Sequence, residues 1–599
     1  MIQPLINPKE LPFQLYEVLD TEALLARERF SEHSKDTFDA ILNTADKIAT
    51  EKFANHNAKA DSQEPTYDGQ NVHMIEEVKH AFDAYSAAGF MAGRYDFDEG
   101  GMQLPESIMM ACSGFFMAAN PSTAGYPFLT VAAANVIRNF ASPTLVEQFM
   151  PRMLSGEFTG TMALTEPHAG SSLADIRTQA TPADDGSYRL KGSKLYISGG
   201  EHQLSENIVH LVLAKIQGAP AGVKGISLFV VPKYRLDEQG NPKTKNDVAL
   251  AGLIHKLGYR GTTSTALTFG ENDDCYGYLV GEPHQGLRYM FLMMNEARIG
   301  VGFGAAMIGY SGYQYSLAYA KERTQGRLPP HNSPTDAATE IINHGDVKRM
   351  LLAQKSYVEG AISLCLYAAR LVDDINTLNA EDEKRSTEEL LDLLTPVVKA
   401  WPSEFGVKAN DLAIQVLGGA GYTREYPVEQ CWRDNRLNPI HEGTNGIQAL
   451  DLLTRKLWQA NGAGLRTLQH RMQQDFSKAD GEFCLPLVTA LSPYLNELQG
   501  LIPKLAKGLH SEDQPTLLAN AQCFMNIFSS IVISWIWIRQ ANVAEAALQH
   551  CEQADKHYYL GKIQAAKYYI HWELPLIQRD ISLLNELDDS CSGMQADWF

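Results

Sequence analysis

The fold is decided by the stretch Thr159-Gly-Thr-Met-Ala-Leu-Thr-Glu-Pro-His-Ala-Gly-Ser-Ser172, where helical periodicity gives way to a β-type run followed by turn formers. Similar short runs, set off by Gly, Pro, Asn and Asp, follow at Tyr188 to Ile197, Ile208 to Leu213, Gly225 to Pro232 and Thr263 to Phe269. They predict a middle antiparallel β domain over residues 156–285. Because these strands do not alternate with long helices, a dinucleotide-binding Rossmann unit is disfavoured.

The chain reads as helical on both sides of this domain. Apolar residues at helical spacing predict an N-terminal helical domain over residues 1–155 and a helical bundle over residues 286–461. The long bundle segments are Leu287 to Ala320, Ile341 to Val372, Thr387 to Leu417 and Gly446 to Ala460. A linker, Asn461-Gly-Ala-Gly464, precedes a C-terminal helical extension over residues 462–599. The predicted fold class is therefore α+β and multidomain.

The composition excludes several classes of protein. With 45% hydrophobic and 20% charged residues the chain is globular, and 51 basic against 71 acidic residues give a net charge of −20, which disfavours a nucleic-acid partner. Eight scattered cysteines favour reduced thiols over a zinc site. Pro4, Pro8 and Pro12 interrupt the region where a signal peptide would be apolar, so we expect a cytoplasmic protein. Cys523 to Ile538 is apolar but interrupted by polar residues, which favours a buried or interface helix over a membrane contact.

Two glycine-rich segments differ in their context. Gly300-Val-Gly-Phe-Gly304 lies inside a helical pattern with no preceding strand, which favours close helix packing over a phosphate loop. Gly418-Gly-Ala-Gly421 closes a helix, so it is either a helix cap or a place where a phosphate or adenine approaches the backbone. The hydroxyl-rich stretch Leu164 to Ser172 is likewise either a capped turn or a site for a planar heterocycle and a phosphate-bearing ligand.

A carboxylate precedes the helix predicted from Ile447 to Leu457. In Asn438-Pro-Ile-His-Glu-Gly-Thr-Asn-Gly446, Thr444 or Asn445 is suited to cap that helix, which places Glu442 on a loop ahead of it. Glu442 either points into a cavity or is a surface acid favoured by the helix dipole. His441-Glu442 is not a zinc-binding helix, because no second histidine follows at the required spacing.

The order of these segments resembles the acyl-CoA dehydrogenase family over roughly residues 70 to 458. The resemblance is carried by Leu-Thr-Glu-Pro-x-Ala-Gly-Ser, Leu257-Gly-Tyr-Arg-Gly261, the Arg298 helix, Glu322-Arg323, Gln-Val-Leu-Gly-Gly-Ala-Gly-Tyr and Glu-Gly-Thr-Asn. The added tail, with the segment from Leu11 to Asp20, is similar to a large bacterial subgroup of about 600 residues that carries an extra C-terminal helical domain.

The resemblance implies an FAD-dependent enzyme that converts an acyl-CoA thioester to a trans-2-enoyl-CoA, with Glu442 as the catalytic base. The residues implied to hold FAD are Met162, Leu164, Thr165, Tyr196, Ser198, Arg323, Gln415, Gly419 and Thr444. Those implied to contact CoA are Ser171, Asn295 and Arg298. The expected partners are the acyl-CoA substrate, an electron-transfer flavoprotein and a second identical subunit, with no metal.

Some positions depart from the family pattern, and alternatives stay open. Glu322-Arg-Thr-Gln-Gly326 lacks the usual Phe, and Gly446 replaces a common Gln, so FAD contacts from the partner subunit are expected to differ. Some relatives carry the base on the Arg298 helix, where Ala297 now stands, and its neighbour Glu296 is a distant second candidate. An acyl-CoA oxidase and a DNA-associated alkylation-response protein are the competing functions, and the sequence does not specify the acyl-chain length.

Overall fold

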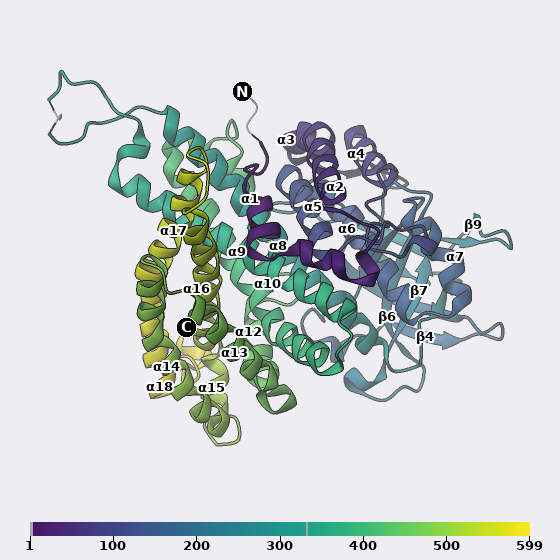
Figure 1. The fold of residues 1–599 in the computed structure, drawn as a ribbon. Helices are drawn as coiled ribbons and strands as arrows, with labels where there is room; N and C mark the ends of the chain where they lie inside the picture. Colours follow the sequence, from purple (N-terminus) through teal and green to yellow (C-terminus); the bar gives the residue numbers. More distant parts are fainter. Residues whose placement is uncertain (1–3, 331–332) are drawn as a thin grey trace. The chain divides into compact units, whose positions relative to one another are not determined.

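The computed structural model describes residues 4–330 and 333–599, which form two compact units (Figure 1). Asp36–Ala297 form the first, here called the sheet unit, and Met1–Lys35 with Arg298–Phe599 form the second, the helical unit. The helical unit is therefore discontinuous in sequence, with the sheet unit inserted between its two parts.

Two helices of the sheet unit, α6 (Pro121–Phe140) and α7 (Pro143–Leu154), begin at residues whose side chains cap them. The α-helices that precede them are α2 (Lys35–Ile48), α3 (Asn57–Ser62), α4 (Glu76–Ala87) and α5 (Glu106–Ala119). The Asn120 side chain accepts from the backbone N–H of Thr123 at 3.1 Å, and that of Ser142 accepts from Leu145 at 3.4 Å. A proline follows each cap at the first helical position, where no amide donor is needed.

The main sheet has eight strands and holds the core of its unit. The strands of the unit are β1 (Thr66–Tyr67), β2 (Val72–His73), β3 (Phe158–Ala163), β4 (Gln179–Pro182), β5 (Tyr188–Ser198), β6 (Asn207–Ile216), β7 (Ile226–Pro232), β8 (Tyr234–Leu236), β9 (Pro242–Lys245), β10 (Val248–Leu253), β11 (Ser264–Phe269) and β12 (Tyr276–Leu279). The order is β10-β11-β5-β12-β7-β6-β3, with β4 pairing with β5 and β6. Pairing is antiparallel except where β6 meets β3 and β4. Leu190, Val212, Phe229 and Phe269 pack together in its core.

Long helices form the bundle of the helical unit. They are α8 (Gly286–Glu322, which starts in the sheet unit), α9 (Gly345–Thr377), α10 (Glu381–Leu417), α11 (Val428–Asn435) and α12 (Asn445–Thr454). The predicted close packing at the first glycine segment is confirmed, because a Cβ on Gly302 would lie 1.9 Å from the Val398 carbonyl oxygen of α10. The helix expected to run to Ala460 ends earlier. Backbone at Ala460 and Asn461 is left-handed, so the chain turns before the next helix.

Six α-helices follow in the C-terminal part of the helical unit: α13 (Ala463–Lys478), α14 (Cys484–Gly508), α15 (Gln514–Ala519), α16 (Ala521–Ala547), α17 (Lys556–Tyr568) and α18 (Gln578–Glu586). Among the described residues, α16 alone is long and apolar enough to cross a membrane, yet 83% of its most apolar window is buried within the protein. Its Ser534 hydroxyl donates to the Ser530 carbonyl, and the Trp537 indole donates to the Ser356 carbonyl of α9 at 3.0 Å. As expected, α16 is a core helix.

The N-terminal segment is anchored in this unit by buried charges. Glu10 lies in α1 (Glu10–Pro12) and is fully buried, as is Lys562 of α17. The Lys562 ammonium nitrogen is 2.6 Å from a Glu10 carboxylate oxygen and 2.8 Å from one of Glu359 on α9. One buried lysine thus joins the start of the chain, the bundle and the C-terminal extension.

Candidate active site

Glu442 lies in a strained turn between α11 and α12. Its φ is +51°, a left-handed value that is uncommon for a residue with a side chain, and Gly443 follows at +81°. The Gln448 side-chain amide donates to the carbonyls of Glu442 and Gly443 at 3.3 and 3.4 Å. As predicted, Thr444 caps α12, accepting from the Ile447 N–H at 3.2 Å. Left-handed backbone of this kind costs about 1–3 kcal/mol and clusters at functional sites.

Two cations surround the half-buried side chain of Glu442. Burial raises the pKa of Glu442 above its ordinary value, against the opposing charges of Arg298 and Lys399. Arg298 on α8 is 5% exposed and lies 4.0 Å from a carboxylate oxygen of Asp451. His441 is held neutral because burial lowers its pKa to about 3. A carboxylate with a raised pKa in a partly dry site is a stronger base than one in water.

Three other predicted residues of the helical unit lie on exposed chain. Arg323 follows the end of α8, Gln415 lies in the last turn of α10, and Gly419 lies in the short 3-10 helix that follows it. The Tyr319 and Tyr426 rings meet edge to face at 5.9 Å, so the segments that carry these residues are neighbours. A Cβ on Gly419 would meet nothing within 4 Å in the described chain. The backbone at Gly419 is therefore accessible to a ligand.

The predicted residues of the sheet unit gather at the ends of β3 and β5. The backbone N–H of Leu195 donates to the Thr165 carbonyl at 2.9 Å, which joins the loop after β3 to β5. Tyr196 has a φ of +60°, and its ring is 61% exposed. Met162 and Leu164 lie beside these residues on the β3 side, with Ser198 exposed at the end of β5. The structure thus brings together the five residues of this unit that were predicted to hold FAD.

The CoA residues predicted in the sheet unit lie farther along the same chain. Ser171 is exposed in the loop after β3, and Asn295 lies on α8. Its neighbour Glu296 receives two hydrogen bonds from the Asn135 amide, at 2.7 and 2.9 Å. Both carboxylate oxygens of Glu296 are therefore engaged by a single side-chain amide.

Two buried lysines, one in each unit, have no role in the sequence-based interpretation. Lys194 of β5 is 2.9 Å from Glu166, and Lys399 of α10 is fully buried near Glu442. Glu166 also accepts from the backbone N–H groups of Arg177 and Thr178, at 2.6 and 3.0 Å. Lysines are usually solvated, so only tertiary contacts reveal these two.

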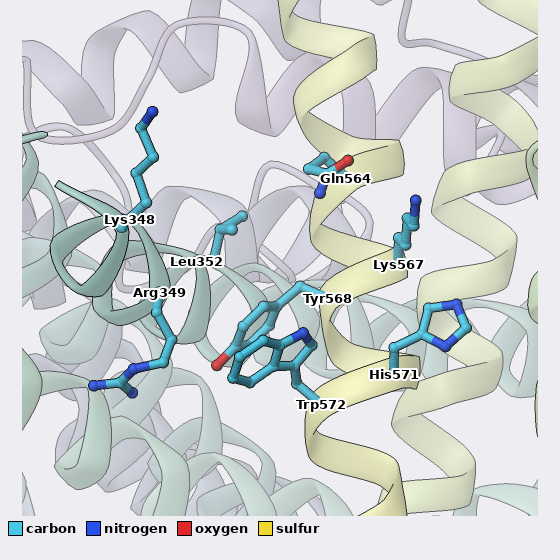
Figure 2. Close-up of a pocket in the computed structure, with 9 residues that line it drawn as sticks. Lys348, Arg349, Leu352, Gln564, Lys567, Tyr568, His571 and Trp572 are labelled. Atoms are coloured by element: carbon cyan, nitrogen blue, oxygen red, sulfur yellow. The ribbon is translucent and has the colours of Figure 1, made fainter. Parts of the chain in front are cut away.

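A basic, aromatic cavity of about 350 Å³ lies elsewhere in the helical unit (Figure 2). Lys348, Arg349 and Leu352 of α9 line one side, and residues of α17 and the following turn line the other. The rings of Tyr568 and Trp572 stack there with centroids 5.6 Å apart. None of the predicted site residues lies in this cavity.

Comparison with known proteins identifies the family. A 3-methylmercaptopropionyl-CoA dehydrogenase of Ruegeria pomeroyi is 32% identical over 97% of this chain and 98% of its own. The chain belongs to the acyl-CoA dehydrogenase family. Family models match in order: "Acyl-CoA dehydrogenase, middle domain" at residues 161–271, "Acyl-CoA dehydrogenase, C-terminal domain" at 284–457, and "Acetyl-CoA dehydrogenase C-terminal like" at 468–595. The resemblance stated from the sequence is confirmed.

A further relative and two solved structures match most of the chain. The broad-specificity linear acyl-CoA dehydrogenase FadE5 of Mycobacterium tuberculosis is 32% identical over 97% of each chain. Among solved structures, Caenorhabditis elegans ACDH-11 in complex with C11-CoA superposes with a TM-score of 0.74 at 18% identity, covering 96% of this chain and 95% of its own. A Bacillus anthracis acyl-CoA dehydrogenase complexed with FAD gives 0.72 at 18%, covering 95% and 90%. These two structures confirm the fold class.

Proposed function

We propose that this acyl-CoA dehydrogenase removes the α-proton of an acyl-CoA thioester with Glu442 and forms a trans-2-enoyl-CoA. The observation that carries the proposal is the left-handed, half-buried Glu442, whose pKa is raised by burial despite two neighbouring cations. An α-proton is too weakly acidic for a carboxylate in water, so a base of this kind has to be held and desolvated. The turn beside α12 supplies both conditions.

The residues at the ends of β3 and β5 fit an FAD ring. Tyr196 offers an exposed aromatic face, Ser198 an exposed hydroxyl and Thr165 a partly exposed one. An aromatic face suits stacking on a flat heterocycle, and hydroxyls suit its ring nitrogens and oxygens. When bound, FAD would accept the hydride from the β-carbon at N5. We further propose that Arg323, Gln415 and Gly419 hold its adenosine diphosphate part in a homodimer, aided by Thr444.

For the substrate, we propose that Ser171, Asn295 and Arg298 contact CoA. Because Arg298 is 5% exposed, its charge also acts on Glu442. The relatives named above act on a methylmercaptopropionyl thioester and on linear acyl chains, and a Syntrophomonas wolfei relative at 33% identity is a butyryl-CoA dehydrogenase. We therefore propose an acyl-CoA without a fixed chain length, 3-methylmercaptopropionyl-CoA being one candidate, and electron-transfer flavoprotein as the acceptor in the cytoplasm.

Anaerobic bleaching of the flavin by a panel of acyl-CoAs tests the base. We expect Glu442→Gln to purify with yellow FAD that no member bleaches, while Glu296→Gln is bleached. Bleaching of Glu442→Gln near the wild-type rate would show that Glu442 is not the catalytic base. Loss of bleaching in Glu296→Gln alone would identify Glu296 as the base. Peroxide released in air without an added acceptor would favour the oxidase.

A further inference from the structure

Lys399 differs from the other buried lysines of the described chain. Four lysines are buried: Lys194, Lys399, Lys456 and Lys562. The other three each have a carboxylate oxygen within 2.9 Å, supplied by Glu166, Asp392 and Glu10 respectively. No carboxylate of the described residues lies within 4.0 Å of the Lys399 ammonium, whose one hydrogen bond goes to the Asn445 side-chain oxygen at 3.1 Å. A fully buried cation without an ion pair is costly, so its retention calls for an explanation.

The anion that acts on Lys399 is Glu442. Burial lowers the pKa of Lys399 to about 7; the charge of Glu442 opposes this shift, and the charge of Arg298 adds to it. The other charged groups around the turn are occupied or neutral. Asp451 accepts two hydrogen bonds from Arg455, at 2.7 and 3.0 Å, and lies near Arg298, while His441 is neutral.

Lys399 also acts on the backbone of the turn through Asn445. The Asn445 amide accepts from Lys399 and donates to the Ala400 carbonyl at 3.4 Å, so both ends of the amide are held by α10. Its backbone N–H donates to the Pro439 carbonyl at 3.0 Å, which closes the loop that contains Glu442. The helix that supplies the cation therefore also fixes the position of the carboxylate.

We propose that Lys399 is a positioning residue for Glu442: its ammonium group keeps the resting carboxylate ionised, and its bond to Asn445 fixes the strained turn. This inference rests on the proposed function. When Glu442 takes the α-proton from the substrate, the carboxylate becomes a neutral acid and Lys399 is left without its anion. The same cation then favours return of that proton to solvent before the next cycle.

The test is the pH dependence of flavin bleaching in the holoenzyme, with whichever of butyryl-, octanoyl- and palmitoyl-CoA bleaches wild type fastest. For Lys399→Met we expect the acid limb, where Glu442 must be ionised, to move upward by about one pH unit, as when an adjacent opposite charge is removed. The matched control is Lys456→Met, a buried lysine paired with Asp392, which should leave the limb unchanged. Asn445→Ala should lower the rate at every pH without moving the limb.

Infrared spectroscopy supplies a readout that needs no turnover. The difference between wild type and Glu442→Gln isolates the carboxyl band of Glu442, and the same difference in a Lys399→Met background should titrate about one unit higher. Lys399→Gln, which can still donate to Asn445, replaces the methionine variant if that fails to fold. An unmoved limb and an unmoved band would overturn the proposal for Lys399. Bleaching of Glu442→Gln would instead overturn the proposed function.

Discussion

Replacing Glu166 by alanine should strongly destabilise the sheet unit. Glu166 accepts four hydrogen bonds, from the Arg177 N–H, the Thr178 N–H and hydroxyl, and the Lys194 ammonium, at 2.6 to 3.0 Å. Burial raises the pKa of Glu166, but the Lys194 charge and these bonds outweigh it and hold that pKa below its ordinary value. The carboxylate therefore stabilises the fold at neutral pH, and this contribution is lost as the pH falls through its folded pKa.

The magnitude follows from what the substitution leaves behind. Lys194 is fully buried, and removing one partner of a buried ion pair costs about 3–5 kcal/mol. At roughly 2–4 °C per kcal/mol for a unit of this size, the melting temperature should fall by about 10 °C. Lys191→Met is the matched control on the same strand, because its pair with Asp273 is exposed at both ends and worth at most about 1 kcal/mol.

Calorimetry of the holoprotein, with flavin fluorescence to follow release, measures both variants. Adding Lys194→Met to Glu166→Ala should restore part of the lost stability, since the uncompensated cation is then gone. The reasoning is refuted if Glu166→Ala melts within 2 °C of Lys191→Met, a margin of about 1 kcal/mol. A double variant less stable than the sum of the single changes would contradict the ion-pair account in particular.

Three further outcomes are expected. Burial lowers the pKa of His202 and of His210 to about 3, so as the pH falls the unfolded chain binds their protons before the folded chain does. The free energy of unfolding should therefore fall by about 1.4 kcal/mol per pH unit for each histidine below pH 6.5. Urea unfolding of a His202→Gln/His210→Gln variant should show a flatter dependence of this free energy on pH, and an unchanged slope would contradict the prediction. Gly302→Ala should lower the free energy of unfolding by about 3 kcal/mol, because the new Cβ meets the Val398 carbonyl. The control Gly561→Ala has room beside Lys355 and should not destabilise the protein. Equal melting temperatures of the two variants would count against close packing of α8 on α10. Lys562→Met should leave Glu10 without its cation and expose the N-terminal segment to trypsin; protection equal to that of wild type would show that the buried charges do not hold it.

Local signals in the sequence located most of the regular structure. Strand runs predicted β3, β5, β6, β7 and β11 to within a few residues, and the end of α10 falls at Leu417 as expected. Short strands such as β8 and β9 were not predicted, because three or four residues carry little periodicity. The parallel pairing of β3 with β6 could not be predicted, since it depends on partners 49 residues apart such as Thr161 and His210.

The site was predictable where its residues are consecutive. Thr444 as a cap and Glu442 ahead of a helix both follow from local sequence, and the Gly443 that comes next hints at the left-handed turn. Of the two cations around Glu442, Arg298 was singled out from the sequence and Lys399 was not. Lys399 precedes Glu442 by more than forty residues, and nothing in the local pattern distinguishes this lysine from solvated ones.

The buried link between Glu10 and Lys562 has a consequence for how the chain is made. The two residues are separated by 552 positions, so at roughly 5–20 residues per second Glu10 leaves the ribosome about half a minute to two minutes before its partner is synthesised. During that interval the first helix has no place to dock, whereas the residues of the compact Asp36–Ala297 unit have already been synthesised together. A transcript cut short anywhere before α17 would therefore yield a product whose N-terminal segment cannot dock, and quality-control proteases can recognise such a segment.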